Sequence, residues 1–405
     1  MAEADTLLDL TDAGFRADPY PALAAVRGLG PLPVHEGLGV RLAASYADAG
    51  TVLRSRDLGR TYTLRVPRAG RPAQEWDTFN WLHEHALLEV EAPTHTRLRR
   101  LVASAFGRGH VERLRAQVEL LAAGLLDTCA AELARDGSFD VVAGLAEPLP
   151  VLVIAELLGW PAAERDVLRP WSQAIVAMYE PDPTPAAEAA ARQAAEEFAG
   201  AVVALAHDRA RHPGDDLLSD LVAVRDDGDR LSERELVATV VLLLNAGHEA
   251  SVNGFGNGLV PLLARGSAAP VVGGEEALLV EEMLRHDAPL QLFERTAVRD
   301  CVVAGVDLRR GERVAALLGA ANRDPARFAE PDVFDPVRSR DPRQAHLSFG
   351  AGTHFCLGAP LARLELQVAV AALLRRWPRL EVVRATRRPT FVLRGWSEVH
   401  VRPVG

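Results

Sequence analysis

The chain lacks lysine entirely, so all 45 of its basic residues are arginine. Arginine does not titrate in practice, and its planar guanidinium forms a fork that pairs with carboxylates. The basic side chains are therefore suited to fixed ion pairs. Acidic residues outnumber them, and the net charge of −10 argues against nucleic acid as a general partner.

Cysteine is also scarce, because Cys129, Cys301 and Cys356 are the three in the chain. An odd number in a long chain does not suit a disulfide framework and fits a reducing cytosol. The first ten residues show no basic segment followed by an apolar core, so no secretory signal is expected. No uninterrupted apolar run reaches the ~18 residues of a membrane span. We therefore expect a cytoplasmic protein without a membrane anchor, with Cys129 in its core and no assigned role for Cys301.

No repeat, low-complexity segment or Ser/Gly-rich linker divides the chain, which favours a single domain over residues 1–405. Apolar residues recur at three- and four-residue steps, which is typical of amphipathic helices. The expected fold class is therefore mostly α (α+β), with only short strands. The clearest helical patterns cover 111–135, 160–178, 186–211, 232–264 and 359–376, and the strand-like segments are 39–42, 301–306, 380–383 and 399–401.

One segment carries the strongest chemical signal, since residues 349–358 read Phe-Gly-Ala-Gly-Thr-His-Phe-Cys-Leu-Gly. Cys356 ends a glycine-rich turn directly before a helical pattern, where the helix dipole and free N–H groups stabilise a thiolate. The glycines let a flat ligand approach the backbone closely, and His354 could donate to an anionic group at its edge. The arrangement suits an axial thiolate for a haem iron. A cysteine between glycines is by itself more often a buried, inert residue.

The segment resembles the haem-binding loop of the cytochrome P450 family, F-x-x-G-x-x-x-C-x-G, in the bacterial form with His two positions before Cys. The resemblance implies haem b (iron protoporphyrin IX) as the cofactor and Cys356 as its axial metal ligand, whose electron donation favours O–O cleavage. It also places Phe349, Gly350 and Gly358 in the cofactor-binding loop.

The same resemblance implies the cytochrome P450 fold within that single domain. A large helical, haem-binding part is expected over roughly 90–376. A small β-rich lobe is expected from roughly 1–60, together with the C-terminal strands. The segment Asn322–Phe328 also resembles the family, but an ordinary polar turn would read the same way.

A second motif is Glu282-Met283-Leu284-Arg285, whose three-residue spacing puts Glu282 and Arg285 on one helical face where they can pair. Such a pair is common on protein surfaces and is weak evidence alone. By resemblance, Glu282 and Arg285 form a structural network with Arg338 that holds the haem-binding loop. They are not assigned to catalysis.

A third motif supplies candidate ligands for the haem propionates. His95 and Arg99 lie four residues apart after Pro93, a plausible helix start, so both point the same way. By resemblance they bind a propionate, as do Arg295 and His354. A guanidinium suits a carboxylate through charge-assisted bonds. Each of these residues singly could be an ordinary solvated side chain.

A fourth motif lies inside the long helix expected over 232–264. By resemblance this helix crosses the haem face with the pattern A-G-x-[E/D]-T, and the chain keeps Ala246, Gly247 and Glu249. The glycine permits a local break in the helix that makes room for dioxygen. The acid and the alcohol of the pattern relay protons to the distal oxygen. Without the cysteine loop, a plain core helix would explain this stretch equally well.

The chain departs from that pattern at Ala250, where the family usually has threonine, and Ser251 follows. Three explanations stay open. A substrate hydroxyl could supply the missing donor, Ser251 could replace it although one residue is about 100° around a helix, or the reaction could need less proton delivery. We favour the first, which implies an oxygenated substrate.

By resemblance, the substrate pocket is lined from five variable segments, about 62–86, 165–195, 241–251, 289–294 and 391–396. Their mostly apolar side chains suit a small molecule, although each aromatic residue could equally belong to the core. The pocket candidates are Trp76, Phe79, Trp81, Met178, Tyr179, Leu242, Leu290, Leu292, Phe293, Val392 and Trp396. Four arginines, Arg60, Arg65, Arg68 and Arg71, precede Trp76 and favour a solvated entrance loop, or else a contact with an acidic or carrier-bound substrate.

Electrons must come from a partner, because the sequence has no cysteine cluster and no G-x-G-x-x-G after a strand. The resemblance implies a ferredoxin or flavodoxin with its reductase. Arg97, Arg100 and Arg363 flank the expected haem-carrying elements and could steer such an acidic partner.

The sequence therefore predicts a bacterial haem-thiolate monooxygenase of secondary metabolism. It would use O2 and two electrons to hydroxylate or epoxidise a small organic molecule, an oxygenated metabolite or a steroid- or macrolide-like compound. A peroxide-using or oxidative-coupling haem-thiolate enzyme is the alternative that Ala250 keeps open. A degenerate haem fold that serves as a recruitment domain is the non-enzymatic alternative.

Overall fold

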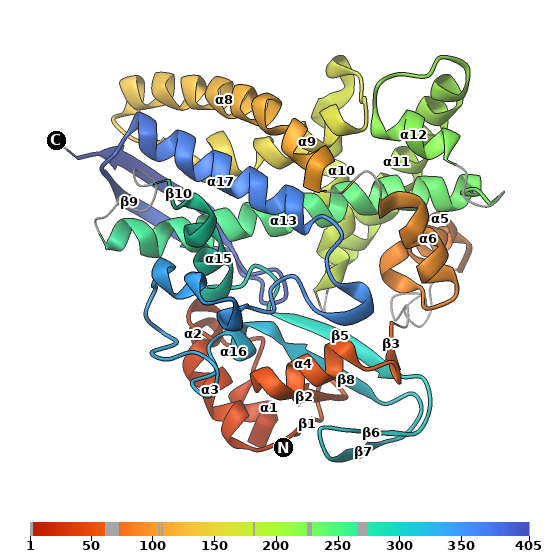
Figure 1. The fold of residues 1–405 in the computed structure, drawn as a ribbon, viewed down its shortest axis with the longest axis vertical. Helices are drawn as coiled ribbons and strands as arrows, with labels where there is room; N and C mark the ends of the chain where they lie inside the picture. The colour runs from red at the N-terminus through yellow and green to blue at the C-terminus, as the bar shows by residue number, and fades with distance from the viewer. Residues whose placement is uncertain are drawn as a thin grey trace. The chain divides into compact units, whose positions relative to one another are not determined.

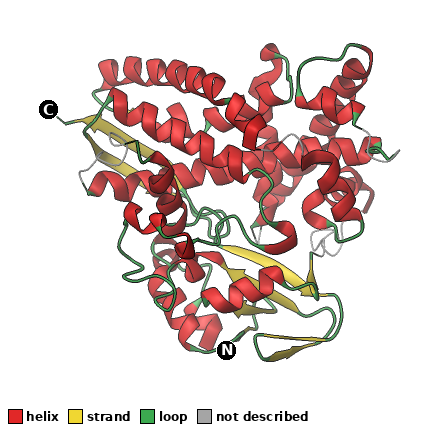
Figure 2. Ribbon diagram, viewed as in Figure 1, coloured by secondary structure: helices red, strands yellow, loops and turns green. Residues whose placement is uncertain are grey.

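The computed structural model describes residues 3–60, 73–103, 106, 108–180, 183–224, 229–265 and 274–404. Helices predominate among them (Figure 2), as the sequence predicted. The chain forms two compact units. The first unit consists of Met1–Gly59, Ala122–Ala146 and Ala250–Gly405, and the second of Arg60–Leu121 and Glu147–Glu249. The expectation of a single domain stays a prediction.

A five-stranded sheet organises the first unit (Figure 1), with the strand order β1-β2-β8-β5-β3. The expected lobe thus draws strands from distant parts of the sequence, because its centre pairs a strand after residue 290 with one after residue 310. The central pair is antiparallel, with Leu292 opposite Leu317 and Thr296 opposite Arg313. The strands are β1 (Val34–His35), β2 (Val40–Ala43), β3 (Leu58–Gly59), β5 (Leu292–Ala297) and β8 (Arg313–Leu317).

Small helices cover this sheet and bury its apolar side chains. Ala43, Val314 and Ala316 lie in one buried cluster, while Leu42 and Leu317 lie in another. This alternation follows from the period of two along a strand. The covering and neighbouring helices are α1 (Glu3–Leu7), α2 (Ala13–Ala17), α3 (Tyr20–Gly28), α4 (Tyr46–Arg54) and α16 (Leu318–Asn322).

The segment expected as one strand over 301–306 is instead a hairpin of two short strands. Ala304 and Gly305 have φ values of 51° and 77°, so the backbone turns there and cannot continue as a strand. The hairpin consists of β6 (Cys301–Val303) and β7 (Val306–Leu308).

The C-terminal strands belong to a second sheet with the order β4-β10-β9. Its strands are β4 (Phe139–Asp140), β9 (Leu380–Arg387) and β10 (Trp396–Pro403).

Two further helices of the first unit bear on the site. Helix α15 (Glu276–His286) carries the E-x-x-R motif, and helix α17 (Ala359–Arg376) follows Cys356. Cys129 is buried, and its sulfur would lie 2.6 Å from a Cβ on Gly144, so that glycine allows close packing. Burial raises the pKa of the Cys129 thiol to about 11, which fits the expected core role. The short elements are the π-helical turn η5 (Val142–Ala146) and the 3-10 turns η8 (Pro336–Arg340), η9 (Pro342–Gln344) and η10 (Gly352–His354).

The second unit is built of helices packed on one another. The helix expected over 160–178 is divided, because the α-helical part begins only at Leu168. Pro170 lacks an N–H group and would clash with a preceding turn, so it is tolerated only in the first turn of a helix. The elements are η2 (Ala73–Trp76), α5 (Asp77–Glu84), η3 (Leu87–Glu89), α6 (Thr94–Ala103), α7 (Arg108–Arg113), α9 (Pro148–Leu157), η6 (Ala162–Val167), α10 (Leu168–Val176), η7 (Ala177–Tyr179), α11 (Pro185–Arg211) and α12 (Leu217–Ala223).

Two long helices, α8 (Arg115–Asp136) and α13 (Glu233–Ala264), contribute residues to both units. By length and hydropathy α13 alone among the described helices could span a membrane, but 67% of its most apolar stretch is buried, as in a core helix. Helix α13 is continuous, so the expected break at Gly247 is absent. A Cβ at Gly247 would lie 2.3 Å from the Ile154 side chain, so the glycine serves close helix packing.

The same kind of close approach makes a prediction about stability in the first unit. A Cβ on Gly258 would lie 2.3 Å from the Cβ of Met283, whereas nothing lies within 4 Å of one on Gly124 of α8. We expect Gly258→Ala to destabilise the fold by ~1–3 kcal/mol through overpacking. Gly124→Ala should instead stabilise it by up to ~1 kcal/mol through helix propensity. Urea titrations followed by circular dichroism measure the free energy of unfolding of both variants. Equal shifts of the two unfolding midpoints would contradict the close packing of Gly258 against Met283.

Candidate functional site

The turn that precedes Cys356 is fixed by backbone hydrogen bonds and by one close approach. The Cys356 N–H donates to the Phe349 carbonyl at 2.9 Å, and the Gly350 N–H donates to the Leu347 carbonyl at 2.8 Å. Gly350 and Gly352 adopt φ values of 68° and 72°, which side-chain-bearing residues rarely adopt. A Cβ on Gly352 would also lie 2.6 Å from the Leu53 carbonyl oxygen of α4. Both glycines are therefore required by this turn.

Cys356 lies immediately before helix α17, whose N-cap is Gly358 and whose first turn contains Pro360. Cys356 is half-buried and forms no disulfide. The free N–H groups and the dipole at a helix N-terminus favour a thiolate. In the part of the chain that the structure describes, no cluster of three or more His, Cys, Asp or Glu could ligate a bare metal ion. A single accessible thiolate fits a haem iron, whose equatorial ligands come from the porphyrin.

The first half of the turn is anchored to α15 and α16. The Leu347 N–H donates to Asn322 Oδ1 at 2.7 Å, and Asn322 Nδ2 donates to Ser348 Oγ at 2.8 Å. The Ser348 hydroxyl in turn donates to the Leu284 carbonyl at 2.7 Å. The sequence analysis missed Asn322 as a supporting residue, although it belongs to the segment that resembles the family.

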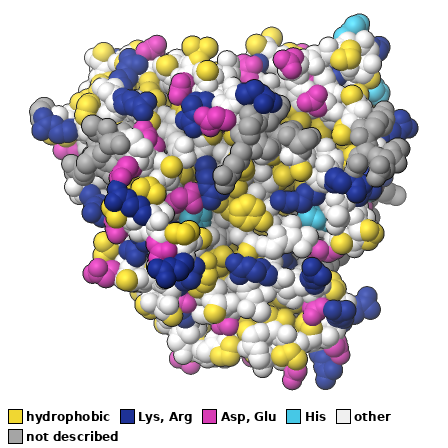
Figure 3. All heavy atoms as spheres, viewed as in Figure 1, with side chains coloured by type: hydrophobic (Ala, Val, Ile, Leu, Met, Phe, Trp, Pro, Cys, Tyr) yellow, Lys and Arg dark blue, Asp and Glu magenta, His cyan; other side chains and the backbone are white. Residues whose placement is uncertain are grey.

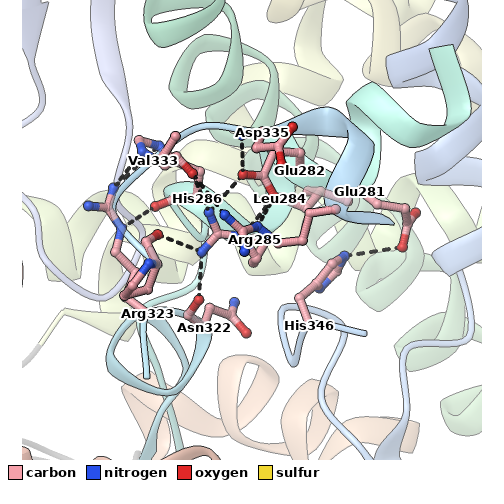
Figure 4. A network of polar contacts seen from close by, with 12 residues as sticks. Glu281, Glu282, Leu284, Arg285, His286, Asn322, Arg323, Val333, Asp335 and His346 are labelled. Carbon is pink, nitrogen blue, oxygen red and sulfur yellow. Dashed lines mark hydrogen bonds and ion pairs between the residues drawn. The ribbon is translucent and has the colours of Figure 1, made fainter. Parts of the chain in front are cut away.

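Glu282 and Arg285 lie together (Figure 4), as their spacing predicted. Arg338 lies near the same carboxylate. Arg285 donates to both carboxylate oxygens of Glu282 at 2.7 Å, and Arg338 Nε lies 3.8 Å from Glu282 Oε2. Glu282 and Arg285 are almost fully buried. Arg285 also donates to three backbone carbonyls, those of Asn322, Pro331 and Val333. The network therefore joins α15 to α16, to the segment 331–333 and, through Arg338, to η8 itself.

A neighbouring glutamate on α15, Glu281, makes a second network, in which it lies next to His346 (Figure 4). Arg363 of α17 donates to Glu281 through Nε at 2.6 Å and through Nη2 at 3.0 Å. His346 Nε2 lies 3.3 Å from Glu281 Oε2. Burial alone would raise the pKa of Glu281, but the contacts with His346 and Arg363 outweigh it and lower that pKa to about 2. The carboxylate is therefore charged at physiological pH.

The four candidate propionate ligands are divided between the two units. Arg295 and His354 belong to the first unit, and His95 and Arg99 belong to the second. Arg295 is buried, donates to the Glu294 carbonyl at 3.1 Å and lies 4.4 Å from the Phe293 ring centre. On helix α6, His95 is buried and Arg99 is half-buried. A buried guanidinium is well suited to an acidic ligand group.

On α13, the candidate acid and alcohol are both buried. Glu249 is 4% exposed and Ser251 is 6% exposed, and Ala250 between them is half-buried. One face of this helix is partly accessible to solvent, because Ala246 is exposed and Leu242 and Ala250, one turn away on either side, are half-buried. Small and apolar side chains therefore form the accessible stripe of an otherwise buried helix.

The structure reveals a buried acid that the sequence analysis missed. Glu365 of α17 is 3% exposed and is hydrogen-bonded to Ser251 of α13. Burial raises the pKa of Glu365 to about 8, because the hydrogen bond from Ser251, which lowers it, is the weaker effect. The only signal in the sequence is a glutamate between two leucines in an apolar helical pattern, Leu364 and Leu366.

The pocket candidates of the second unit form an aromatic cluster. The rings of Trp76 and Phe79 meet edge to face, with their centres 5.4 Å apart. The Phe79 ring stacks on the His83 ring, with their centres 4.3 Å apart. Burial lowers the pKa of His83, and burial also raises the pKa of Tyr179, whose ring contacts His83 edge-on. Trp76 and Phe79 are buried, so these side chains are at least partly core. Trp81 and Leu242 are half-buried and Met178 is buried, while Arg65, Arg68 and Arg71 lie outside the described residues.

The candidates of the first unit lie on two segments that are joined by backbone contacts. The Gln291 N–H donates to the Val392 carbonyl at 2.9 Å, and Leu290 pairs with Leu393 as an antiparallel bridge. Trp396 packs on α13, because a Cβ on Gly256 would lie 3.0 Å from its ring. Leu290, Leu292 and Phe293 remain half-buried.

Buried Asp287 fixes these two segments in place. It accepts hydrogen bonds from Tyr20 Oη at 2.7 Å, Arg387 Nη2 at 2.8 Å and Arg394 Nε at 2.9 Å. Burial would raise the pKa of Asp287, but the two guanidinium groups outweigh it and lower that pKa. The carboxylate thereby ties the end of α15 to both ends of the turn between β9 and β10.

Basic and acidic side chains are interspersed on the face shown in Figure 3. Two of the three arginines expected to steer a partner are engaged in ion pairs. Arg97 contacts Asp229 and Glu235 in the second unit, and Arg363 contacts Glu281 in the first. Their charge is thus partly neutralised within the protein, which weakens the expected basic patch.

A cytochrome P450 family model matches residues 278–394, the stretch that contains the E-x-x-R motif of α15 and the Cys356 turn. The chain is similar to the cytochrome P450 monooxygenase PikC of Streptomyces venezuelae, with 39% identity over 384 residues that cover 92% of this chain and 88% of the relative. It is also similar to the 6-deoxyerythronolide B hydroxylase of Saccharopolyspora erythraea, with 37% identity over 415 residues that cover 98% of this chain and 99% of the relative.

Among solved structures, P450BioI in complex with an acyl carrier protein ligated to hexadec-9Z-enoic acid matches with a TM-score of 0.87 and 31% identity, over 97% of this chain and 99% of that one. This likeness confirms the predicted cytochrome P450 fold. Members of the family use haem, dioxygen, an organic substrate and an electron-donating partner. Because it shares its fold and nearly its whole length with named monooxygenases and hydroxylases, the chain belongs to the cytochrome P450 family and is an oxidoreductase of the monooxygenase type.

Proposed function

We propose that this P450 hydroxylates or epoxidises an oxygenated secondary metabolite, with electrons from a ferredoxin or flavodoxin and its reductase. The observation that carries the proposal is the Cys356 turn. Its two left-handed glycines and the hydrogen bond from the Cys356 N–H hold the sulfur at the N-terminal end of α17. The features place the sulfur where a helix N-terminus favours the thiolate, the form that ligates a metal.

Cys356 would be the axial ligand of haem b, with Phe349, Gly350 and Gly358 forming the loop beneath it. When bound, the haem iron supplies the activation of dioxygen and the transfer of one oxygen atom to the substrate. By the family resemblance, Arg295 and His354 would bind its propionates, and His95 and Arg99 would be the further propionate ligands. Ala246, which is exposed, would offer a helix surface without a bulky side chain to the cofactor, whereas Gly247, the neighbouring candidate, packs against Ile154.

Proton delivery in this chain would run through Ser251 and Glu365. At neutral pH the Glu365 carboxyl is largely protonated, so it can donate to Ser251 Oγ. The Ser251 hydroxyl can then pass its own proton to a water or a substrate hydroxyl. Glu249, buried two residues earlier on the same helix, is a second acid available to this route. Ala250 carries no donor, so the last hydrogen bond would come from a substrate hydroxyl or a water.

The substrate class follows from Ala250 and from the relatives. An alanine methyl cannot donate a hydrogen bond, so a substrate that carries its own hydroxyl would complete the site. Relatives with similar sequences include a 6-deoxyerythronolide B hydroxylase and a polyketide biosynthesis P450. We therefore propose a macrolide- or polyketide-like substrate bearing oxygen atoms. The predicted cytoplasmic location would suit both this substrate and a soluble electron donor.

The identity of the metal ligand is tested by the ferrous–carbon monoxide difference spectrum. We expect a band near ~450 nm for the parent protein, because a thiolate ligates the iron. Cys356→Ser should abolish this band. Cys301→Ser, which removes a half-buried thiol from the β6–β7 hairpin of the same unit, should retain it. A parent band near ~420 nm, or retention in Cys356→Ser, would remove Cys356 as the ligand.

The raised pKa of Glu365 predicts a pH-dependent stability. In the folded protein that pKa is about 8, against the ordinary value of 4.5, so between these values the folded state holds one more proton than the unfolded state. The carboxyl therefore costs stability increasingly as pH rises through this window. We expect the free energy of unfolding of Glu365→Gln, relative to the parent, to rise from about pH 4.5 and to level off above about pH 8.

Urea titrations over this pH range measure the effect, and Ser251→Ala serves as the companion variant. The Ser251 hydrogen bond lowers the pKa of Glu365, so its loss should move the upper end of the window to higher pH. A constant difference between Glu365→Gln and the parent across the window would show that Glu365 is not held protonated.

The substrate hydroxyl is tested by restoring the side-chain donor with Ala250→Thr. With a hydroxylated macrolactone as the probe, the product formed per electron consumed should change by less than about tenfold, because the substrate already fills this role. With the corresponding deoxy compound, the same variant should raise the product yield per electron clearly above that of the parent. A sharp rise with the hydroxylated probe would contradict substrate participation.

A further inference from the structure

We propose that Glu281 is a positioning residue for the Cys356 turn, which it holds through His346, Arg363 and the ring of Phe349. This inference rests on the proposed role of Cys356, and it adds to that proposal a residue outside the Glu282–Arg285–Arg338 network. Figure 4 shows the Glu281 carboxylate pointing toward His346 rather than toward Arg285.

The first step is that Glu281 joins the two sides of the turn. His346 lies ten residues before Cys356, and Arg363 lies seven residues after it. Arg363 donates two hydrogen bonds to the Glu281 carboxylate, and His346 Nε2 lies 3.3 Å from it. One carboxylate on α15 therefore restrains the chain both before and after the cysteine.

The orientation of His346 is fixed by a second contact. The Ser348 N–H donates to His346 Nδ1 at 3.1 Å, so Nδ1 is an acceptor and the ring proton lies on Nε2. Nε2 lies 3.3 Å from Glu281 Oε2, within ion-pair distance. The His346 side chain is only 3% exposed, whereas the Glu281 and Arg363 side chains are about a third exposed or less. The imidazole is thus enclosed by protein beside the Glu281 carboxylate.

The second step is that both partners of Glu281 contact Phe349. The Arg363 guanidinium lies 4.4 Å from the centre of the Phe349 ring, a cation–π distance. The His346 ring lies 5.7 Å from the same ring. The Phe349 carbonyl accepts the hydrogen bond from the Cys356 N–H at 2.9 Å. A displacement of Arg363 or His346 would thus reach the cysteine backbone through one residue.

The test compares Glu281→Gln with Glu276→Gln. Glu276 is on the same helix and pairs with Arg375, also on α17, at 2.8 Å, so both changes remove one ion pair between α15 and α17. Only Glu281 has partners that contact Phe349. We expect the band near ~450 nm of the haem-loaded Glu281→Gln protein to convert to ~420 nm roughly tenfold faster than in the parent, because a charge-assisted contact is lost. Glu276→Gln should convert at the parent rate.

Hydrogen exchange of the loop 346–358 in the purified proteins gives a second readout that does not depend on the haem spectrum. The Cys356 amide should exchange faster in Glu281→Gln and at the parent rate in Glu276→Gln. Should Glu281→Gln fail to fold, Arg363→Lys keeps the charge, loses the fork, and should accelerate exchange to a smaller extent.

Equal behaviour of Glu281→Gln and Glu276→Gln in both measurements would overturn the inference. Failure of the proposed function looks different. In that case the parent protein itself would lack the band near ~450 nm, while the comparison of amide exchange would still report whether Glu281 holds the turn.

Discussion

The first unit depends on one buried charge, the guanidinium of Arg285. It is 2% exposed, and Glu282 neutralises it through two hydrogen bonds while three backbone carbonyls satisfy its remaining donors. Removing either partner would leave an uncompensated charge in the interior, at a cost of roughly 3–5 kcal/mol. Because the carbonyls of Asn322 and Pro331 belong to segments on the way to the Cys356 turn, the pair also determines where that turn begins.

Helix α15 uses successive residues for separate tasks. Glu282 and Arg285 satisfy each other inside the unit, Glu281 contacts the two sides of the cysteine turn, and Asp287 at its end holds the turn between β9 and β10. An all-arginine set of basic residues suits this arrangement. Each network uses several donors of one planar group in fixed directions, which a lysine ammonium at the end of a flexible chain would not reproduce.

Much of the fold was predictable from periodicity. The long helices α11, α13 and α17 begin and end within a residue or two of their apolar patterns. The errors fall where backbone geometry decides. The hairpin at Ala304 and Gly305 depends on positive φ angles, and the division before α10 depends on Pro170. The break expected at Gly247 is absent, and the missing side chain instead makes room for Ile154. Periodicity reports which side of a segment is apolar, but not which neighbour fills the space.

By itself, the sequence determined the cysteine turn, the E-x-x-R pair and the absence of threonine at position 250, because these depend on residue type and short spacing. Only the tertiary structure decided which distant residues complete them. Glu365 reaches Ser251 across 114 positions of sequence, and Glu281 reaches His346 across 65. Burial of Glu365 between helices, which sets its protonation, is a property of packing. Contacts between segments distant in sequence have no fixed spacing, so a local sequence pattern cannot predict them.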